Sequence, residues 1–361
     1  VSKDMKVGPP DRMQWVGSPK FSRHHDFMAS LNALVSAGGR LFYIIDEGSN
    51  ASIQLPSRWR LIARDGFNGK VLWKRDLPSW HSHYWRLKSG PARLPRKLVA
   101  SGDEVYVTLG IDAGLTALDA ATGEELRTYE QTKATKEFVH SDGVLFAVVD
   151  EDAREDYRPG EDSAAPAKIR GLAGKTNWET APDHLVAVRA GTGETLWKRK
   201  DRLVPLTLAA TDKGVFYFNG KSVVRLNRKN GKRVWASPKL AAVSPIPLWF
   251  APTLVVQGDV VLFSGGKGAT WHRGANNDMV ALDMETGEVL WNAPHPRMDY
   301  DSPEDLLIAQ GAVWTGPINK GGQSGTITGR DIRTGEVVSE FPADDWRHMP
   351  HHRCHRAKAT E

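Results

Sequence analysis

Residues 281–291 read ALDMETGEVLW, and this one phrase contains the parts of a tight β-hairpin. An alternating apolar strand leads into a polar corner, and a second strand leaves the corner and ends on Trp291. Gly287 supplies the positive φ that closes such a corner. Asp283, four residues earlier, is a residue type that hydrogen-bonds to its own backbone and holds a turn. The phrase therefore predicts a β-hairpin.

Variants of this phrase occur six times along the chain. The turn glycines are Gly69, Gly123, Gly193, Gly231, Gly287 and Gly335. Four residues after them stand Trp73, Arg127, Trp197, Trp235, Trp291 and Ser339. A second alternating segment with its own turn precedes each copy, so each repeat contains four strands. The glycines are 38 to 70 residues apart, which brackets the roughly 40–50 residues of a propeller blade.

The repeats predict an all-β fold, a β-propeller of four-stranded antiparallel blades. We expect one propeller domain over residues 1–361, with six complete blades in 28–341. Residues 12–16 (RMQWV) resemble the last strand of a repeat, with Trp15 in the aromatic position, and are expected to close the ring. Residues 348–361 are expected to begin a further, truncated blade. The parent protein is then expected to have seven or eight blades, and the remainder of its chain is needed to close the ring.

The connections predict where binding occurs. The turns inside each hairpin are short in every repeat, whereas the links between hairpins vary greatly in length. In an up-and-down blade all the variable links emerge on one face. Because binding residues concentrate on loops carried by a rigid scaffold, we expect function on this long-loop face.

Composition excludes several classes of protein. The net charge is +5, and the basic residues are scattered, which argues against a nucleic-acid partner. No apolar run is long enough to span a membrane. Cys354 is the only cysteine, so no intrachain disulfide can form. The chain starts at Val1 without a signal-like segment, as expected for a mature form or an excised piece.

The repeat A-L-D-x-x-T-G-E-x-L-W, nearly whole at residues 281–291, resembles that of the quinoprotein (PQQ-like) β-propellers. The flanking stretches, residues 13–45 and HHRCHRAKATE at 351–361, are similar to a poorly characterised group of large bacterial PQQ-like propeller proteins. The resemblance implies a bacterial, periplasmic or otherwise extracytoplasmic location. It also implies that Trp73, Trp197, Trp235 and Trp291 dock against the neighbouring blade. Arg127 and Ser339 depart from this pattern.

Within the family, PQQ-dependent alcohol dehydrogenases bind PQQ beside Ca²⁺ in the loop-face funnel, under a disulfide between adjacent cysteines. One cysteine rules that disulfide out here, and no C-x-x-C-H haem motif is present. PQQ with Ca²⁺ is therefore a possible cofactor that the sequence does not require.

Two polar clusters are candidate ligand-binding sites, because both are expected beside the central funnel. The first comprises Arg23, His24, His25 and Asp26. The second comprises His348, His351, His352, Arg353, Cys354 and His355. Arginines between imidazoles suit an anionic ligand. His352, Cys354 and His355 are candidate ligands of a soft or borderline metal. The alternative is that these histidines hydrogen-bond to loop backbone near the axis.

Loop residues add further ligand-binding candidates, which are His81, His83, Trp85, Trp271, His272 and Arg273. The alternative is that such aromatics simply cover the tops of the blades. We therefore expect a noncatalytic scaffold that binds a small anionic or aromatic ligand, or a protein partner, through the long-loop face. The second hypothesis is a PQQ-dependent oxidoreductase with the quinone in the funnel.

Overall fold

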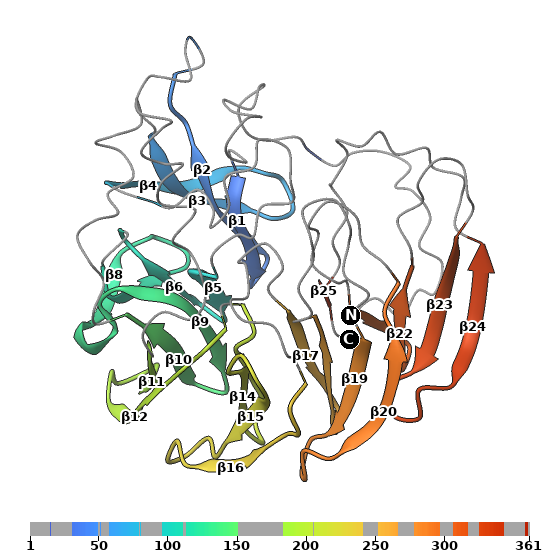
Figure 1. The fold of residues 1–361 in the computed structure, drawn as a ribbon. Helices are drawn as coiled ribbons and strands as arrows, with labels where there is room; N and C mark the ends of the chain where they lie inside the picture. The colour runs from blue at the N-terminus through green and yellow to red at the C-terminus, as the bar shows by residue number, and fades with distance from the viewer. Residues whose placement is uncertain are drawn as a thin grey trace.

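The computed structural model describes residues 15, 31–49, 51, 58–78, 80, 96–110, 113–150, 183–204, 206–240, 252–265, 278–296, 306–316, 325–342 and 358–359. These residues form six sheets, each built on four antiparallel strands, and the predicted all-β propeller is confirmed. The sheets follow one another in chain order along an arc (Figure 1).

Each blade is a simple up-and-down meander of four strands. The first two blades are β1 (Leu31–Ala37), β2 (Arg40–Asp46), β3 (Trp59–Asp65), β4 (Val71–Leu77) and β5 (Leu98–Ser101), β6 (Glu104–Thr108), β7 (Leu115–Asp119), β8 (Glu125–Tyr129). The third and fourth are β9 (Thr135–Ser141), β10 (Val144–Val149), β11 (Asp183–Arg189), β12 (Thr195–Asp201) and β13 (Ala209–Ala210), β14 (Val215–Phe218), β15 (Val223–Leu226), β16 (Arg233–Ala236). The last two are β17 (Thr253–Gln257), β18 (Val260–Ser264), β19 (Asp278–Asp283), β20 (Val289–Pro294) and β21 (Leu306–Ala309), β22 (Ala312–Thr315), β23 (Thr326–Asp331), β24 (Val337–Pro342).

Two short elements complete the described secondary structure. The 3₁₀ helix η1 (Glu130–Thr132) links β8 to β9. The strand β25 (Lys358–Ala359) pairs in parallel with β21 and so joins the sixth sheet. Most of the segment expected to begin a further blade lies outside the described residues, so that blade stays a prediction. In the part of the chain that the structure describes, no helix is long and apolar enough to cross a membrane.

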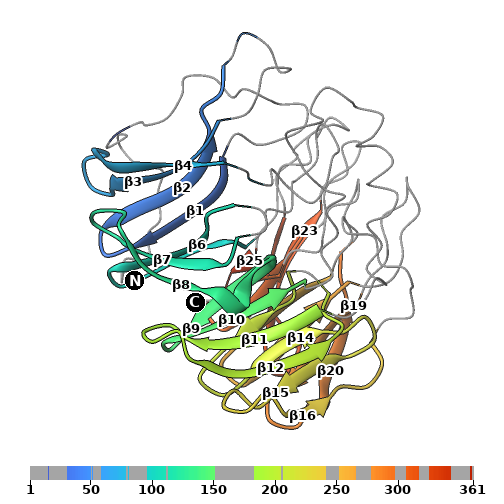
Figure 2. The same ribbon diagram turned by 90° about the vertical axis from the view of Figure 1, so that its left-hand side faces the viewer.

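The hydrophobic core lies between the blades. One cluster joins the first and second blades, with Phe42 and Leu61 packing beside Val105 and Leu118. Four further clusters join the remaining neighbours in turn. Figure 2 shows the first three blades stacked in this way. Because each core is shared by two sheets, each blade depends on its neighbour for burial of its apolar face.

The repeated turn has the geometry that the sequence predicts. In the fifth blade, Asp283 Oδ1 accepts hydrogen bonds from the backbone N–H groups of Glu285 and Thr286, both at 2.9 Å. Hydrogen bonds from the backbone of Thr286, ahead of other causes, lower the pKa of Asp283. Gly287 has φ +76° and donates its N–H to Asp283 O at 2.8 Å.

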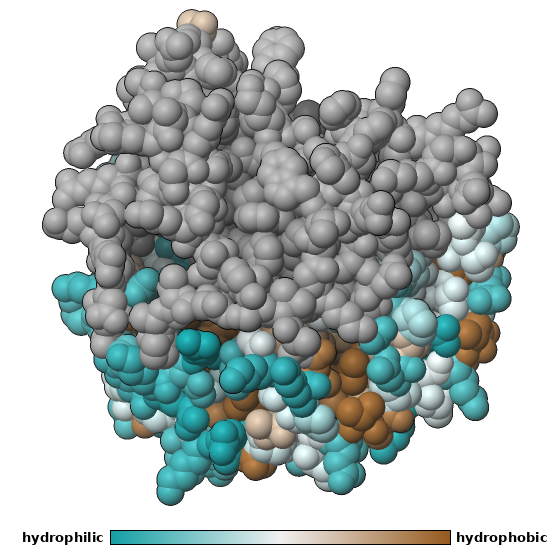
Figure 3. Space-filling view, viewed as in Figure 1, coloured by the Kyte–Doolittle hydropathy of each residue, from teal (hydrophilic) through white to brown (hydrophobic). Residues whose placement is uncertain are grey.

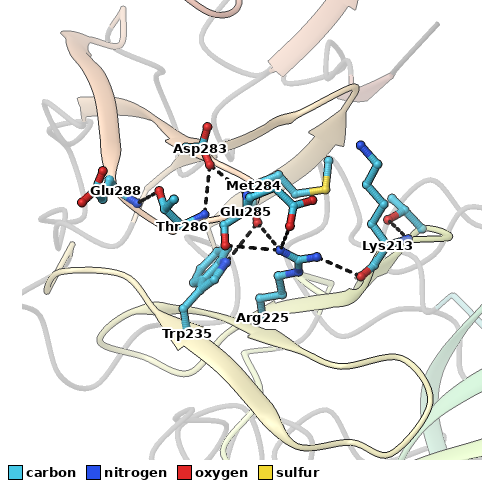
Figure 4. Close-up of polar contacts among 9 residues, drawn as sticks. Lys213, Arg225, Trp235, Asp283, Met284, Glu285, Thr286 and Glu288 are labelled. Atoms are coloured by element: carbon cyan, nitrogen blue, oxygen red, sulfur yellow. Dashed lines mark hydrogen bonds and ion pairs between the residues drawn. The ribbon is translucent and has the colours of Figure 1, made fainter.

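An indole from each of four blades docks on the turn of the next blade. The Nε1–H groups of Trp73, Trp197, Trp235 and Trp291 donate to Ala120 O (3.1 Å), Arg228 O (2.8 Å), Met284 O (3.0 Å) and Ile332 O (3.0 Å). Each indole also lies against the turn glycine of that next blade. Figure 4 shows the joint between the fourth and fifth blades, where Arg225 donates to the same Met284 carbonyl as Trp235.

The second blade replaces the indole with three polar side chains. Arg127 Nη1 and Tyr129 Oη both donate to Ala190 O, at 3.0 and 2.5 Å. Gln131 Nε2 donates to Gly193 O at 3.0 Å. The departure at Arg127 therefore changes the chemistry of the joint and preserves the docking itself.

The glycines of two turns allow a matched test. A Cβ on Gly123 would lie 2.7 Å from the Trp73 ring, whereas a Cβ on Gly193 would meet nothing closer than Tyr129 at 3.8 Å. Both have positive φ, 77° and 78°. Gly193→Ala is expected to cost about 1–2 kcal/mol from backbone strain alone. Gly123→Ala is expected to cost about 3 kcal/mol or more, because Trp73 must also move. Urea unfolding measures both, and equal losses would contradict close docking of Trp73.

Candidate functional site

The ends of the strands define two faces of the propeller. The hairpin turns lie at one end, and we call the opposite end the loop face. In the second and third blades it is formed by Thr108, Leu115, Tyr129 and Thr135 at the strand ends. The first strands of consecutive blades contact one another and so lie innermost. Polar side chains at the starts of these first strands therefore surround the centre of the loop face.

In the described part of the chain, equivalent positions in four blades hold buried polar residues, namely Lys97, Glu137, Thr207 and Thr253. Each directly precedes an apolar residue of the core, which is Leu98, Phe138, Leu208 or Leu254. Sequence reasoning missed this row. The signal is a polar residue at the same distance before the first hairpin turn of several repeats, which emerges only when the repeats are aligned on their turns.

Glu137 connects three consecutive blades. It is 1% exposed, and its Oε2 accepts from Nε and Nη2 of Arg96, at 3.0 and 2.7 Å. Its Oε1 accepts from the backbone N–H of Leu206 at 2.9 Å. Arg96 precedes the second blade, Glu137 lies in the first strand of the third, and Leu206 precedes the fourth. The Glu137 carboxylate is buried and accepts three hydrogen bonds, which hold it in one position. Removing one of these donors would be costly, because a buried charge would be left partly uncompensated.

Lys136, next to Glu137, pairs with two carboxylates. Its Nζ lies 2.8 Å from Asp183 Oδ1 and 2.8 Å from Asp150 Oδ2. Burial acts to lower the pKa of Lys136, but the two carboxylates outweigh it and raise that pKa. Burial raises the pKa of Asp183, and Lys136 opposes that change.

We call Arg96, Lys97, Lys136, Glu137, Asp150 and Asp183 the inner charged cluster. It contains three basic and three acidic groups and fixes strand ends of the second, third and fourth blades to one another. Among the described residues, no group of three His, Cys, Asp or Glu side chains could hold a metal ion.

Buried polar atoms without a partner mark places that an ordered water or a bound group would satisfy. Thr108 and Ser264 end the second strands of the second and fifth blades at equivalent positions, and both are fully buried. Within the described part of the chain, neither hydroxyl oxygen has a hydrogen-bond partner. Trp80 Nε1 is also buried, and no described residue accepts a hydrogen bond from it.

The ligand-binding candidates named from the sequence lie outside the described residues. They are Arg23, His24, His25, Asp26, His81, His83, Trp85, Trp271, His272, Arg273, His351, His352 and Arg353, together with the metal candidates His352, Cys354 and His355. They stay predictions. Two aromatic residues near them, Trp59 and Trp80, are described, and both pack in the core between the first and second blades.

Comparison with known proteins gives a consistent family. A family model described as outer membrane protein assembly factor BamB matches residues 30–179 and 176–338. BamB of Burkholderia pseudomallei is 26% identical over 267 residues, which cover 66% of this chain and 63% of that protein. The dehydrogenase subunit of the quinone-type alcohol dehydrogenase of Acetobacter aceti is 27% identical over 195 residues, 45% of this chain and 25% of that protein. The chain thus spans less than two thirds of either relative.

Among solved structures, BamB from Moraxella catarrhalis has 15% identity and a TM-score of 0.47, with 86% of this chain and 74% of that chain covered. The resemblance to PQQ-like propellers that the repeats predict is confirmed by the family match.

Lys136→Met tests the inner charged cluster through its pH dependence. The variant is expected to lose about 1–3 kcal/mol of stability at pH 7, because buried Asp183 loses its main partner. The pKa of Asp183 is already raised in the folded protein. As the pH falls, Asp183 of the folded variant therefore takes up a proton at a higher pH than Asp183 of the unfolded chain does. Its deficit should therefore shrink as the pH falls towards 4.

The matched control is Lys200→Met, which removes the same charge from an exposed position on β12. It should leave stability nearly unchanged at both pH values. A Lys136→Met deficit that is the same at pH 7 and pH 4 would contradict the assigned pairing.

Proposed function

We propose that this chain, which belongs to the PQQ-like β-propeller family described as outer membrane protein assembly factor BamB, is a noncatalytic binding scaffold. Its loop face binds a protein partner or a small anionic or aromatic ligand. The observation that carries this proposal is the three-blade link at Glu137, which fixes the starts of inner strands before any partner arrives. Fixed strand ends reduce the ordering cost of binding.

A protein partner is favoured by the first relative, whose printed name is that of an assembly factor. We therefore infer an extracytoplasmic, periplasmic location for this chain. The described surface visible in Figure 3 is a mixture of hydrophilic and apolar side chains.

The second candidate is a PQQ-dependent oxidoreductase, suggested by the alcohol dehydrogenase relative. The unpartnered hydroxyls of Thr108 and Ser264 are its specific support, since a bound polar cofactor would satisfy them. The described residues do not fit the whole group. Arg96 is already paired with Glu137, and no described cluster of carboxylates could hold Ca²⁺.

Quinone binding separates the two candidates. We expect the purified protein, mixed with PQQ and Ca²⁺, to develop no bound quinone absorbance and no dye-linked alcohol oxidation. A scaffold needs no electron acceptor, so added PQQ should also leave the melting temperature unchanged. Saturable PQQ binding at micromolar concentration together with alcohol oxidation would replace the scaffold proposal by the oxidoreductase.

Charge reversal on the two faces locates the partner surface. Arg58 and Lys133 are exposed beside strand ends of the loop face, with side chains 60% and 70% exposed. Arg189 and Arg333 are exposed at the hairpin turns, 50% and 52%. Arg58→Glu with Lys133→Glu should lower partner cross-linking in periplasmic extracts at least about fivefold, whereas Arg189→Glu with Arg333→Glu should not. The reverse pattern would place binding on the turn face.

A further inference from the structure

Basic side chains are less evenly scattered than the sequence indicates, because exposed lysines gather on the outer edge of the fourth blade. Residues 195–240 hold 12 Lys or Arg and 2 Asp or Glu residues, whereas the rest of the chain holds 36 and 41. This stretch begins on β12, the outer strand of the third blade, and includes the whole fourth blade. Six of its exposed lysines lie on or beside the outer strands β12 and β16, and we call them the basic rim: Lys198, Lys200, Lys221, Lys229, Lys232 and Lys239.

The packing of the third blade on the fourth brings these lysines to one edge of the propeller. The indole of Trp197 and the guanidinium of Arg199, both on β12, donate to backbone carbonyls of the β15–β16 turn at 2.8 and 3.4 Å. This turn carries two lysines of the rim and so lies beside β12. At the other end of the blade, the backbone N–H of Leu240 donates to Lys221 O at 2.9 Å. The rim therefore follows the outer strand of the fourth blade along its length, and hydrophilic side chains are visible along this lower edge in Figure 3.

The fold does not account for the charge of the rim. Five of the six lysines pair with no carboxylate in the described part of the chain, namely Lys200, Lys221, Lys229, Lys232 and Lys239. The residue after the turn glycine is Lys232 in the fourth blade, whereas four other blades have a glutamate there: Glu124, Glu194, Glu288 and Glu336. All six turn glycines share a positive φ, so the turn does not require a lysine. Because clustered like charges repel one another, the rim indicates an anionic partner.

The composition of the rim fits a lipid surface better than a protein or a nucleic acid. Protein interfaces are depleted in lysine and enriched in aromatic residues, and single-stranded nucleic acids stack on exposed aromatic rings. All aromatic side chains of the described part of residues 195–240 are buried. Lysine is a flexible, hydrated point charge, which suits the mobile phosphates of lipids. Val234 on β16 is 50% exposed and adds an apolar contact among these charges.

We propose that the basic rim binds the phosphate headgroups of an anionic lipid bilayer. Because β16 runs from the hairpin turns towards the loop face, the propeller contacts the bilayer by its edge. The loop face stays open to the partner proposed above, and the lipid contact does not depend on that partner. Each lysine near such a surface contributes roughly fivefold to affinity, and salt screens this attraction.

Co-sedimentation of the full chain with lipid vesicles tests the proposal. We expect binding to vesicles that contain about 40% phosphatidylglycerol and none to vesicles of phosphatidylcholine alone. Raising the salt concentration from about 0.05 M to about 0.5 M should weaken this binding at least about tenfold. Lys229→Glu with Lys232→Glu should also weaken it at least about tenfold, because two positive charges become negative. Since four other turns carry glutamate at the place of Lys232, the thermal midpoint should stay within about 1 °C.

The matched control is Lys70→Glu with Arg333→Glu, which changes the net charge equally at exposed turn positions of the first and sixth blades. It should change the affinity for anionic vesicles by less than about twofold, because both positions lie outside the rim. Equal losses in the two double variants, or equal binding to neutral vesicles, would overturn the proposal. Tighter binding of a random DNA oligonucleotide than of anionic vesicles would assign the rim to nucleic acid and overturn the lipid contact.

Discussion

The indole hydrogen bond to the next turn is the interaction on which the propeller depends. It joins the outer strand of one blade to a backbone carbonyl of the next, and the ring fills the space left by a glycine that has no Cβ. The same carbonyl position is used by Trp73, Trp197, Trp235 and Trp291. A tight turn with positive φ is therefore needed in each blade to receive its neighbour, as well as to close its own hairpin.

The joint tolerates a change of chemistry when its geometry is kept. Arg127 and Tyr129 together reach the carbonyl that one indole reaches elsewhere. Burial and the neighbouring Glu104 raise the pKa of Tyr106 in the same region, so its hydroxyl keeps its proton and donates to Glu104 at 2.6 Å. A polar joint of this kind is satisfied only when all its donors have acceptors, and Ala190 O and Gly193 O accept from all three replacing side chains.

Local sequence was sufficient to predict the blades, because Asp, Gly and Trp stand at fixed spacing within one hairpin and act within it or on its neighbour. It was insufficient for the inner charged cluster. Arg96 is 41 residues from Glu137, and Leu206 is 69 residues from it. Neither the bidentate contact nor the backbone donor has a local signature, so only the packing of three blades brings them together. The histidine-rich segments stay predictions, because they lie outside the described residues.

The Glu137 link has a consequence for how the protein can diverge. The backbone N–H of Leu206 is held at a positive φ of 64°, and a main-chain donor survives any change of the side chain that carries it. Substitutions at residue 206 that accept this conformation therefore leave the link intact, whereas an insertion between residue 206 and the core residue Leu208 displaces the donor itself. The length of this segment is therefore more constrained than its amino-acid composition. Related chains should differ there by substitutions and not by insertions or deletions.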